Sequence, residues 1–591
     1  MEKAKHYLVQ IRKSKYKIVA DLYADYKIRY AVNELVLFFK KATGVRLPVI
    51  SETQVENENA GGYIFVGKNK FNDAILKKKK LDKAKLTTNG YVVKTENGNA
   101  YCVGGDHWGT LYAVYKFLNL TLGFKVYAAD EIKLEEEVLQ KELPEIDVVD
   151  IPDIEWRAES WGILKSDRDF CLRMKLHSLH DVWIHVDGLE NGFCHNTQLF
   201  IPFTEENRSK HPDWFNKDGT EICFSSEGAR AEIVRRLKEH LIEYPDVNNV
   251  TITQSDGAIK WCDCPKCKAS KEKYGTDSAQ VIKFCNLVSR DIQQWFKEQG
   301  SDRQLNIAMF AYGGTRFPPV VEKDGKKVAI DEEVLMDDNV SLLFCGAPHG
   351  GNFFTDEKDK EIKEQVVGWQ AVAKHINYWT YSANFWSYLN FINTFECMQS
   401  VYQYAKSIGA RFILDNAQAY NTEHPGFCYL KIFLQSELQW NTNADMEALI
   451  DEFFVNYFKK AAVPMRKLFD SMREHYSHFF DLPARNINSL NEKPENFPLE
   501  LLQQWNDYIK EAKALMAPPY GSLCPNYPAV YDRIVLESIT VRYLLMKIYP
   551  QSFTNEELVK EHEAFKTDVR RMGIKMYNEW VTSEDFLLWL I

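Results

Sequence analysis

The chain has 591 residues, of which 45% are hydrophobic and 26% charged, and this suits about two to four domains with large buried cores. Its net charge of -10 argues against nucleic-acid binding, since the best basic stripe, the lysine run at 77–80, stands alone and contains no aromatic residue. No apolar run is long enough to span a membrane. The first residues lack the apolar core of a signal peptide, so either the protein is cytoplasmic or a leader preceded this numbering.

The first part of the chain, to about residue 148, alternates strand and helix signals. Strands are predicted at 16–22, 46–50 and 63–67, a hairpin at 90–105, and helices at 25–44 and 109–124. Asn97-Gly98 supplies the positive φ angles of the hairpin turn, and Gly44 suits the end of the first helix. We therefore predict a small α/β domain over 1–148, followed by a linker at 142–156.

The middle of the chain alternates short β runs with helical stretches. Eight strands are predicted, at 156–163, 181–186, 221–225, 249–254, 306–312, 339–345, 375–381 and 411–416. This alternation indicates a TIM (β/α)8 barrel over 149–445, and the long loop at 188–220 suits its functional face. After about residue 446 only amphipathic helices are predicted, so 446–591 is assigned to a C-terminal α-helical domain.

Catalytic residues of a TIM barrel lie just past the C-terminal ends of its strands. The polar and aromatic side chains at those points are Trp161, Lys165, His185, Asp187, His195, Asp256, Tyr312, Arg316, His349, Tyr381, Asn384, Asp415 and Asn416, and Trp379 and Trp386 are added as candidates for a sugar platform with Trp161, Tyr312 and Tyr381. From these we select a substrate-binding set of Trp161, His185, His195, Tyr312, Arg316, Trp379, Tyr381, Asn384 and Asn416. Aromatics make up 13% of the chain, and their flat faces suit sugar rings, although core packing explains any one of them equally well.

Two carboxylates in an aromatic cleft favour glycoside hydrolysis. Asp256 and Asp415 are the predicted catalytic pair, with one protonating the leaving oxygen and the other acting on the sugar or on its amide. Each could instead cap a turn, as Asp-Gly sequences often do, and the structural interpretation is favoured for Asp187. There is no Walker-type phosphate loop and no Gly-x-Ser-x-Gly elbow, and no cofactor is expected.

Three cysteines, Cys262, Cys264 and Cys267, follow Asp256 closely. We interpret them first as part of a braced loop. A structural zinc site is the second interpretation and needs a fourth ligand, such as Cys194 or Cys223. A disulfide between Cys262 and Cys267 suits an oxidising compartment, and a redox centre is least favoured. In each of the structural interpretations the loop would fix Asp256.

Several segments together resemble the bacterial domain of unknown function 4838 family over about 155–460. They are QSDGAIKWCDCPKC at 254–267, YWTYSANFW at 378–386, YAKSIGARFILDN at 404–416, LKIFLQSELQW at 430–440, CHNTQLFIP at 194–202 and FAYGGTRFPP at 310–319. Upstream, 109–131 resembles the small domain that precedes the barrel in β-hexosaminidases and α-glucuronidases.

The resemblance implies a function. Part of this family is grouped as glycoside hydrolase family 163, which implies endo-β-N-acetylglucosaminidase action on complex N-glycans. It also implies a source among gut Bacteroidetes and an exported enzyme whose leader was removed. Asp256 matches the acidic position of the family, whereas Asp415 stands where a glutamate followed by Gln-Gly is expected. A side chain shorter by one methylene changes the reach of a general acid.

We therefore predict a retaining, substrate-assisted glycoside hydrolase that cleaves β-linked N-acetylglucosamine in complex glycans, with carbohydrate as its only partner class. The alternatives are an α-glucuronidase-like hydrolase, in which Arg316 or Lys165 would pair with the uronate, and a catalytically inactive carbohydrate-binding protein. A zinc-dependent nucleic-acid binder is the last alternative, and the acidic charge argues against it.

Overall fold

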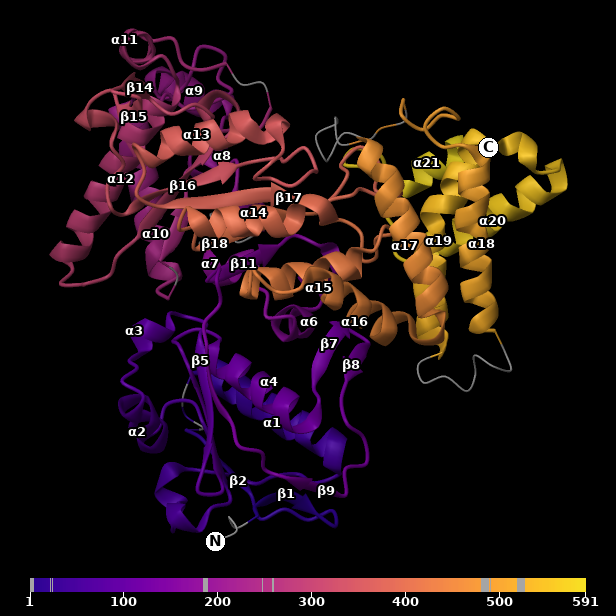
Figure 1. The fold of residues 1–591 in the computed structure, drawn as a ribbon. Coiled ribbons are helices and arrows are strands. Elements are labelled where there is room, and N and C mark those ends of the chain that lie inside the picture. Colours follow the sequence, from indigo (N-terminus) through magenta and orange to yellow (C-terminus); the bar gives the residue numbers. More distant parts are fainter. Residues whose placement is uncertain are drawn as a thin grey trace.

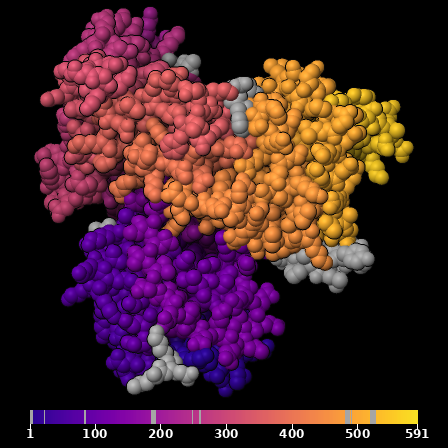
Figure 2. Space-filling model, viewed as in Figure 1, coloured from indigo at the N-terminus to yellow at the C-terminus, as the bar shows by residue number. Residues whose placement is uncertain are grey.

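The computed structural model describes residues 5–21, 23, 25–183, 190–246, 248–257, 260–479, 488, 490–517 and 527–590. Three parts follow one another along the chain (Figure 1): an N-terminal α/β part, a central part with a parallel sheet, and a C-terminal group of helices. In the space-filling view the N-terminal part is a separate lobe, and the other two parts pack against each other above it (Figure 2). Within the described ranges, no helix is both long and apolar enough to cross a membrane.

The N-terminal part is built on a six-stranded mixed sheet. Its strands lie in the order β10 (Asp147–Asp150), β5 (Tyr91–Glu96), β6 (Asn99–Gly104), β4 (Tyr63–Val66), β2 (Lys17–Val19) and β3 (Val49–Ile50). The pairs from β10 to β6 are antiparallel, and those from β6 to β3 are parallel. The predicted hairpin is confirmed, because Asn97 and Gly98 have φ angles of 51° and 71°, as a tight two-residue turn requires.

Helices cover both faces of this sheet. Helices α1 (Tyr26–Thr43) and α4 (Gly109–Leu122) pack together on one face, and α2 (Lys70–Lys78) and the short α3 (Lys83–Leu86) lie on the other. The side chain of Asp25 accepts from the backbone N–H of Lys27 at the start of α1, and Gly44 ends that helix with φ of 75°. Both helices predicted for this part are therefore confirmed.

The segment predicted as a linker, 142–156, is partly a strand. It contains β10, which forms an edge of the N-terminal sheet. The residues of β10 alternate between exposed and half-buried, so the strand lacks the apolar alternation by which strands are recognised. Two antiparallel ribbons complete this part: β1 (Tyr7–Gln10) with β9 (Gln140–Glu142), and β7 (Lys125–Ala128) with β8 (Glu131–Lys133).

The central sheet has six strands in the described residues, and all of its neighbouring pairs are parallel. Their order is β11 (Trp156–Glu159), β18 (Phe412–Asn416), β17 (Ile376–Tyr381), β16 (Val340–Cys345), β13 (Asn306–Ala311) and β12 (Asn249–Thr251). Side chains alternate across it: Phe412 and Leu414 belong to the inner cluster, whereas Ile413 packs with the outer helices. In the described part of the chain the sheet is a curled half-barrel, in which β11 and β12 are the two edge strands.

The predicted eight-stranded barrel is thus confirmed only in part. Of the second predicted strand, 181–186, the first two residues end helix α7 (Leu179–Val182), and those from 184 onward lie outside the described residues. The third, 221–225, makes only an isolated bridge, from Ile222 to Phe215, because its backbone groups pair with those of 214–216 and not with the sheet. His177 makes a single parallel bridge to Ala158 of β11, where a second barrel strand would pair.

Helices surround this sheet on its outer side (Figure 1). They are α5 (Gly162–Ser166), α6 (Arg168–Arg173), α8 (Thr197–Phe200), α9 (Glu205–Lys210), α10 (Glu227–Glu243), α11 (Pro265–Tyr274), α12 (Ser278–Glu298), α13 (Lys360–Gln370), α14 (Phe395–Ser407) and α15 (Cys428–Trp440). The strands β14 (Val320–Lys323) and β15 (Lys326–Ala329) form a separate hairpin.

The C-terminal part is helical, as predicted. Its helices are α16 (Met446–Phe458), α17 (Ala462–Tyr476), α18 (Leu499–Leu515), α19 (Tyr527–Ile548), α20 (Asn555–Arg571) and α21 (Ser583–Trp589). In the described residues of this part, the only β pairing is an isolated bridge between Met576 and Thr582. That bridge closes a turn, 576–582, which we call the C-terminal turn.

Candidate functional site

A pocket of about 220 Å³ lies at the carboxyl ends of the central strands. It is lined by His195, Asp256, Phe310, Tyr312, Cys345, Trp379, Tyr381, Phe385, Trp386, Asn416, Glu579 and Trp580. Six of the residues predicted for the site are therefore brought together: Asp256, His195, Tyr312, Trp379, Tyr381 and Asn416. Parallel strands place their carboxyl ends at one edge, which explains why residues far apart in sequence meet here.

Asp256 lies at the mouth of this pocket, five residues after the end of β12. Its side chain is 64% exposed, so a ligand can reach it. The hydroxyl of Tyr312 donates to its Oδ1 at 3.0 Å, and Nε2 of His195 lies 3.9 Å from the same oxygen. The Nδ1 of His195 donates to the carbonyl of Gln254 at 2.8 Å, which directs Nε2 toward the carboxylate. The carboxylate therefore faces two side chains from different parts of the chain: Tyr312 directly follows β13, and His195 lies in the loop before α8.

The aromatic wall of the pocket comes from two parts of the chain. Trp379 and Tyr381 are alternate residues of β17 and so face the same side. Trp386, from the loop after β17, meets Trp580 of the C-terminal turn with ring centroids 4.9 Å apart. These two indoles are 45% and 60% exposed, so they offer faces to a ligand. Such faces suit the apolar face of a sugar ring.

Glu579 is the second carboxylate of the pocket and was missed by the sequence analysis. The C-terminal turn that carries it is fixed against the barrel: the backbone N–H of Glu579 donates to the carbonyl of Phe385 at 3.2 Å, and that of Tyr388 donates to the carbonyl of Tyr577 at 2.7 Å. The side chain of Asn421 adds another hydrogen bond, because its Oδ1 accepts from the backbone N–H of Met576 at 2.8 Å. No local motif marks Glu579, since only the packing of the helices places it here.

Asp415, predicted as the partner of Asp256, does not line this pocket. It is 2% exposed and faces the outer helices, accepting from the hydroxyl of Tyr402 on α14 at 2.5 Å and from Ser382. Burial raises the pKa of its carboxyl, as it also raises the pKa of Glu159, its neighbour on β11. The reason is the strand period: because Asn416 faces the pocket, Asp415 must face the other side.

Other predicted residues lie elsewhere. Trp161 is 1% exposed, and its Nε1 donates to Gln435 on α15 at 3.1 Å. The guanidinium of Arg316 donates to Gln365 on α13 at 2.8 Å, and Asn384 is fully buried in the loop after β17. None of these three lines the pocket. His185 and Asp187 lie outside the described residues.

The cysteines after Asp256 form a cluster of four thiols. Cys223, one of the two predicted fourth partners, joins Cys262, Cys264 and Cys267, whereas Cys194 does not. The four sulfur atoms all lie within 4.8 Å of one another. Every cysteine in the described part of the chain is a free thiol, so the predicted alternative of a Cys262–Cys267 disulfide is not formed.

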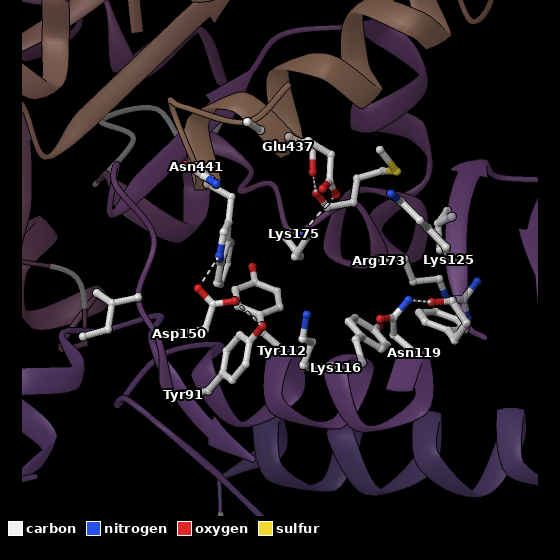
Figure 3. Close-up of a pocket in the computed structure, with 18 of the residues that line it drawn as sticks. Tyr91, Tyr112, Lys116, Asn119, Lys125, Asp150, Arg173, Lys175, Glu437 and Asn441 are labelled. Atoms are coloured by element: carbon white, nitrogen blue, oxygen red, sulfur yellow. Dashed lines mark hydrogen bonds and ion pairs between the residues drawn. The ribbon is translucent and has the colours of Figure 1, made fainter. Parts of the chain in front are cut away.

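A larger cavity, of about 470 Å³, lies between the N-terminal part and the opposite end of the central sheet (Figure 3). Its lining includes Asp150, Ile151 and Asp153, shortly before β11, so it is at the amino ends of the strands. Three of its four cations are already paired: Arg173 with Glu34 at 2.9 Å, Lys125 with Glu452 at 2.9 Å and Lys175 with Glu437 at 3.1 Å. None of the predicted site residues lines it, and we place the candidate site at the other end.

The fold is that of glycoside hydrolases. A family GH115 4-O-methyl-α-glucuronidase with specificity for decorated arabinogalactans matches with a TM-score of 0.56 at 11% identity, covering 97% of this chain and 78% of that one. A family GH138 enzyme targeting pectin rhamnogalacturonan II matches with a TM-score of 0.50 at 10% identity, covering 97% of each chain. At these identities the likeness concerns the fold alone.

The family follows from the sequence match. The chain belongs to the family described as Domain of unknown function (DUF4838), whose model matches residues 136–470. Residues 5–117 match the glycosyl hydrolase family 67 N-terminus, which confirms the predicted likeness of this part to α-glucuronidases. No curated protein matches the chain.

Proposed function

We propose that the protein is a glycoside hydrolase whose active site is the pocket at the carboxyl ends of the central strands. The observation that carries this proposal is that Asp256 and Glu579 line one pocket together with exposed tryptophans. Glycosidases work with two carboxyl groups on the scissile bond, and aromatic faces hold the sugar. Asp256 and Glu579 are therefore our candidates for the two carboxyl groups, in place of Asp256 and Asp415.

The favoured substrate is a β-linked N-acetylglucosamine unit of a complex glycan. Among the described residues that line the pocket there is no lysine and no arginine, so a neutral sugar suits it better than a uronate. In a substrate-assisted reaction the acetamido oxygen of the sugar attacks its own anomeric carbon, and the leaving oxygen takes a proton from a carboxylic acid. We assign Asp256 to orient and polarise the acetamido group, with Tyr312 beside it, and Glu579 to protonate the leaving oxygen.

An α-glucuronidase-like activity is the second candidate. The match of residues 5–117 to the glycosyl hydrolase family 67 N-terminus supports it, as does the fold shared with the GH115 4-O-methyl-α-glucuronidase. Arg316, the cation first considered for pairing with a uronate, is bonded to Gln365 and does not line the pocket. Hydrolysis of uronides without hydrolysis of N-acetylglucosaminides would select this candidate.

Product analysis by mass spectrometry tests the proposal. Wild-type protein, Asp256→Asn, Glu579→Gln and the control Glu584→Gln would be incubated with complex N-glycans and a panel of uronides. Glu584 is an exposed carboxylate that pairs with Arg570 at 2.7 Å and does not line the pocket. We expect wild type and the control to release product, and each pocket variant to be slower by roughly 10²–10⁴-fold.

The leaving group separates the two roles. A variant that lacks the acid regains activity on a dinitrophenyl glycoside, which needs no proton, whereas a variant that lacks the polarising group does not. We therefore expect Glu579→Gln to be rescued by this substrate and Asp256→Asn to stay slow. Equal product release by wild type and Asp256→Asn would remove Asp256 from the mechanism.

A further inference from the structure

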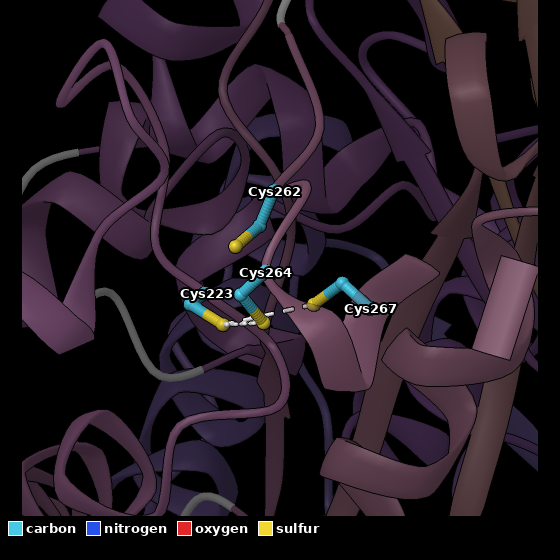
Figure 4. A group of neighbouring side chains, drawn as sticks. All are labelled: Cys223, Cys262, Cys264 and Cys267. Atoms are coloured by element: carbon cyan, nitrogen blue, oxygen red, sulfur yellow. Dashed lines mark hydrogen bonds between the residues drawn. The ribbon is translucent and has the colours of Figure 1, made fainter. Parts of the chain in front are cut away.

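The four clustered thiols have the geometry of a metal site (Figure 4). The sulfur of Cys223 lies 3.8 Å from that of Cys264 and 3.7 Å from that of Cys267. Zinc–thiolate bonds of about 2.3 Å in a tetrahedron separate the sulfur atoms by about 3.8 Å. A disulfide would need a separation of about 2.05 Å. The observed distances therefore match the edges of a tetrathiolate site and not a disulfide.

The backbone presents the four sulfurs from two segments. Cys223 comes from the loop before α10, whereas Cys262 and Cys264 precede α11 and Cys267 lies in its first turn. Cys264 is the residue before Pro265, at the N-terminus of α11. A loop and the start of one helix thus bring four thiols, the ligand set of a structural zinc site, to one point.

We propose that Cys223, Cys262, Cys264 and Cys267 bind one structural zinc ion, and that this ion fixes the segment between β12 and α11, which carries Asp256. Two hydrogen bonds also connect this segment to the chain before α10. The backbone N–H of Ser255 donates to the buried carboxylate of Glu221 at 2.6 Å, and the amide of Asn216 donates to the carbonyl of Lys260 at 2.6 Å. The zinc ion would add a third connection, at the end of the segment next to α11.

The same segment also packs beside Tyr312, which donates a hydrogen bond to Asp256. The indole of Trp261 lies directly on the turn after Tyr312: a Cβ added to Gly314 would lie 2.1 Å from its Nε1. Tyr312 in turn donates to Asp256 at 3.0 Å. The zinc-bound segment thus fixes both members of this hydrogen bond. This positioning role rests on the proposed function of Asp256, whereas the metal site does not.

Elemental analysis of the purified full-length protein tests the metal site. We expect about one zinc per chain after dialysis without chelator, and an intense thiolate-to-metal absorption band when cobalt replaces the zinc. Protein without bound metal, or with iron in place of zinc, would overturn the assignment. This measurement needs no substrate, so it can fail while the proposed hydrolase activity stands, and the reverse is equally true.

Cysteine variants locate the site. Cys262→Ser and Cys264→Ser remove half-buried thiols, and each should lower the zinc content at least fivefold. Cys102→Ala is the matched control, because Cys102 is a buried free thiol of the N-terminal sheet, outside the cluster, and its zinc content should equal that of wild type. Equal zinc loss in the control would contradict the assignment of these four ligands.

Limited proteolysis of wild type tests the positioning role without any variant. Lys260 lies within the segment and is exposed, so trypsin cleavage after it reports how well the segment is held. We expect removal of zinc by a chelator to accelerate this cleavage at least tenfold, and added zinc to reverse the effect. Stoichiometric zinc whose removal leaves the cleavage rate unchanged would overturn the positioning role.

Discussion

At the scale of single residues, the direction of a side chain decides whether a strand-end carboxylate belongs to the site. Asp256 is exposed in the pocket, whereas Asp415 is buried against α14 and α15. Nearby, the ammonium of Lys431 donates to the carbonyl of Ser382 at 3.0 Å, and burial lowers the pKa of Lys431 to about 8. Asp415 thus takes part in a buried polar network, in which a missing partner is costly.

Replacement of Asp415 should therefore affect stability more than chemistry. We expect Asp415→Asn to lower the free energy of unfolding by about 1–3 kcal/mol, because the buried lysine loses a nearby carboxyl. The kcat/KM should change by less than about threefold, since the side chain does not line the pocket. Denaturant unfolding and hydrolysis rates measured on one preparation check this. A loss of activity as large as that of Asp256→Asn, at unchanged stability, would restore Asp415 as a catalytic residue.

The sequence alone selected six residues that line the pocket, because the strand-end rule selects positions: they are Asp256, His195, Tyr312, Trp379, Tyr381 and Asn416. It could also have excluded Asp415. Asp415 and Asn416 are neighbours on one strand, so only one of them can face the pocket. The residues 412–414 already show the pattern, with Phe412 and Leu414 on the inner side. The two-residue period of the strand, applied together with the strand-end rule, would have selected Asn416 and not Asp415 as the residue that faces the pocket.

At the scale of elements, the start of α15 depends on a carboxylate from another helix. Phe427 precedes α15 with a positive φ of 60°, which is uncommon for a bulky side chain. The backbone N–H groups of Gly426 and Phe427 both donate to Glu537 of α19 at 2.9 Å. Glu537 is buried, and burial raises the pKa of its carboxyl to about 8. The N-terminus of α15 is thus held by a group that titrates near neutral pH.

This pKa predicts a pH-dependent stability. In the folded state Glu537 keeps its proton up to about pH 8, whereas in the unfolded state it loses that proton above its usual value of 4.5. The unfolded state then binds fewer protons than the folded state. The contribution of Glu537 to the free energy of unfolding is therefore fully present below about pH 4.5 and is lost as the pH rises to about 8, by a few kcal/mol in order of magnitude. Glu423, whose pKa burial raises to about 7, acts with the same sign.

Glu537→Gln checks this expectation. The amide oxygen of glutamine still accepts from the two N–H groups but does not titrate, so the slope of stability against pH between about 5 and 8 should become shallower. Urea unfolding at a series of pH values measures that slope. Glu556→Gln, a change on the exposed first turn of α20, is the control and should leave the slope as in wild type. An unchanged slope in Glu537→Gln would exclude this carboxyl as the cause.

Elements were predicted well where periodicity is strong and poorly where polar contacts replace it. The long amphipathic helices and the six buried strands are present as expected. The stretch 221–225 reads as a strand, yet Glu221 bonds the backbone of Ser255 and Cys223 joins the thiol cluster. Such long-range polar contacts have no local periodicity, so propensity alone could not show that this stretch is a loop.

At the scale of the whole molecule, a ribbon of the N-terminal part docks on the C-terminal helices. Arg533 of α19 donates to Glu131 of β8 at 2.9 Å, to Asp130 at 2.8 Å, and to the carbonyl of Tyr457 on α16 at 2.7 Å. Its guanidinium also lies over the ring of Tyr457, 4.3 Å from the centroid. Arg533 is 5% exposed, so this contact is part of an interior and not a surface ion pair.

Removal of that guanidinium should weaken the whole chain. We expect Arg533→Met to lower the free energy of unfolding by about 3 kcal/mol, because Glu131 and the Tyr457 carbonyl lose a buried donor. Arg570→Met is the matched control: its pair with Glu584 is exposed on both sides, so its loss should change the free energy of unfolding far less. Chemical denaturation followed by tryptophan fluorescence compares the two. Equal destabilisation by both variants would show that this contact between the parts is not special.

The pocket itself needs more than one part of the chain. Glu579 follows Asn416 by about 160 residues, yet both side chains line the same cavity. A ribosome must therefore synthesise the C-terminal helices before the wall of the pocket exists. A nascent or truncated chain that has folded only its central sheet would present Asp256 without Glu579 and Trp580. On the proposed function, hydrolysis would therefore begin only after Trp580 has been synthesised and the C-terminal turn has packed against the central part.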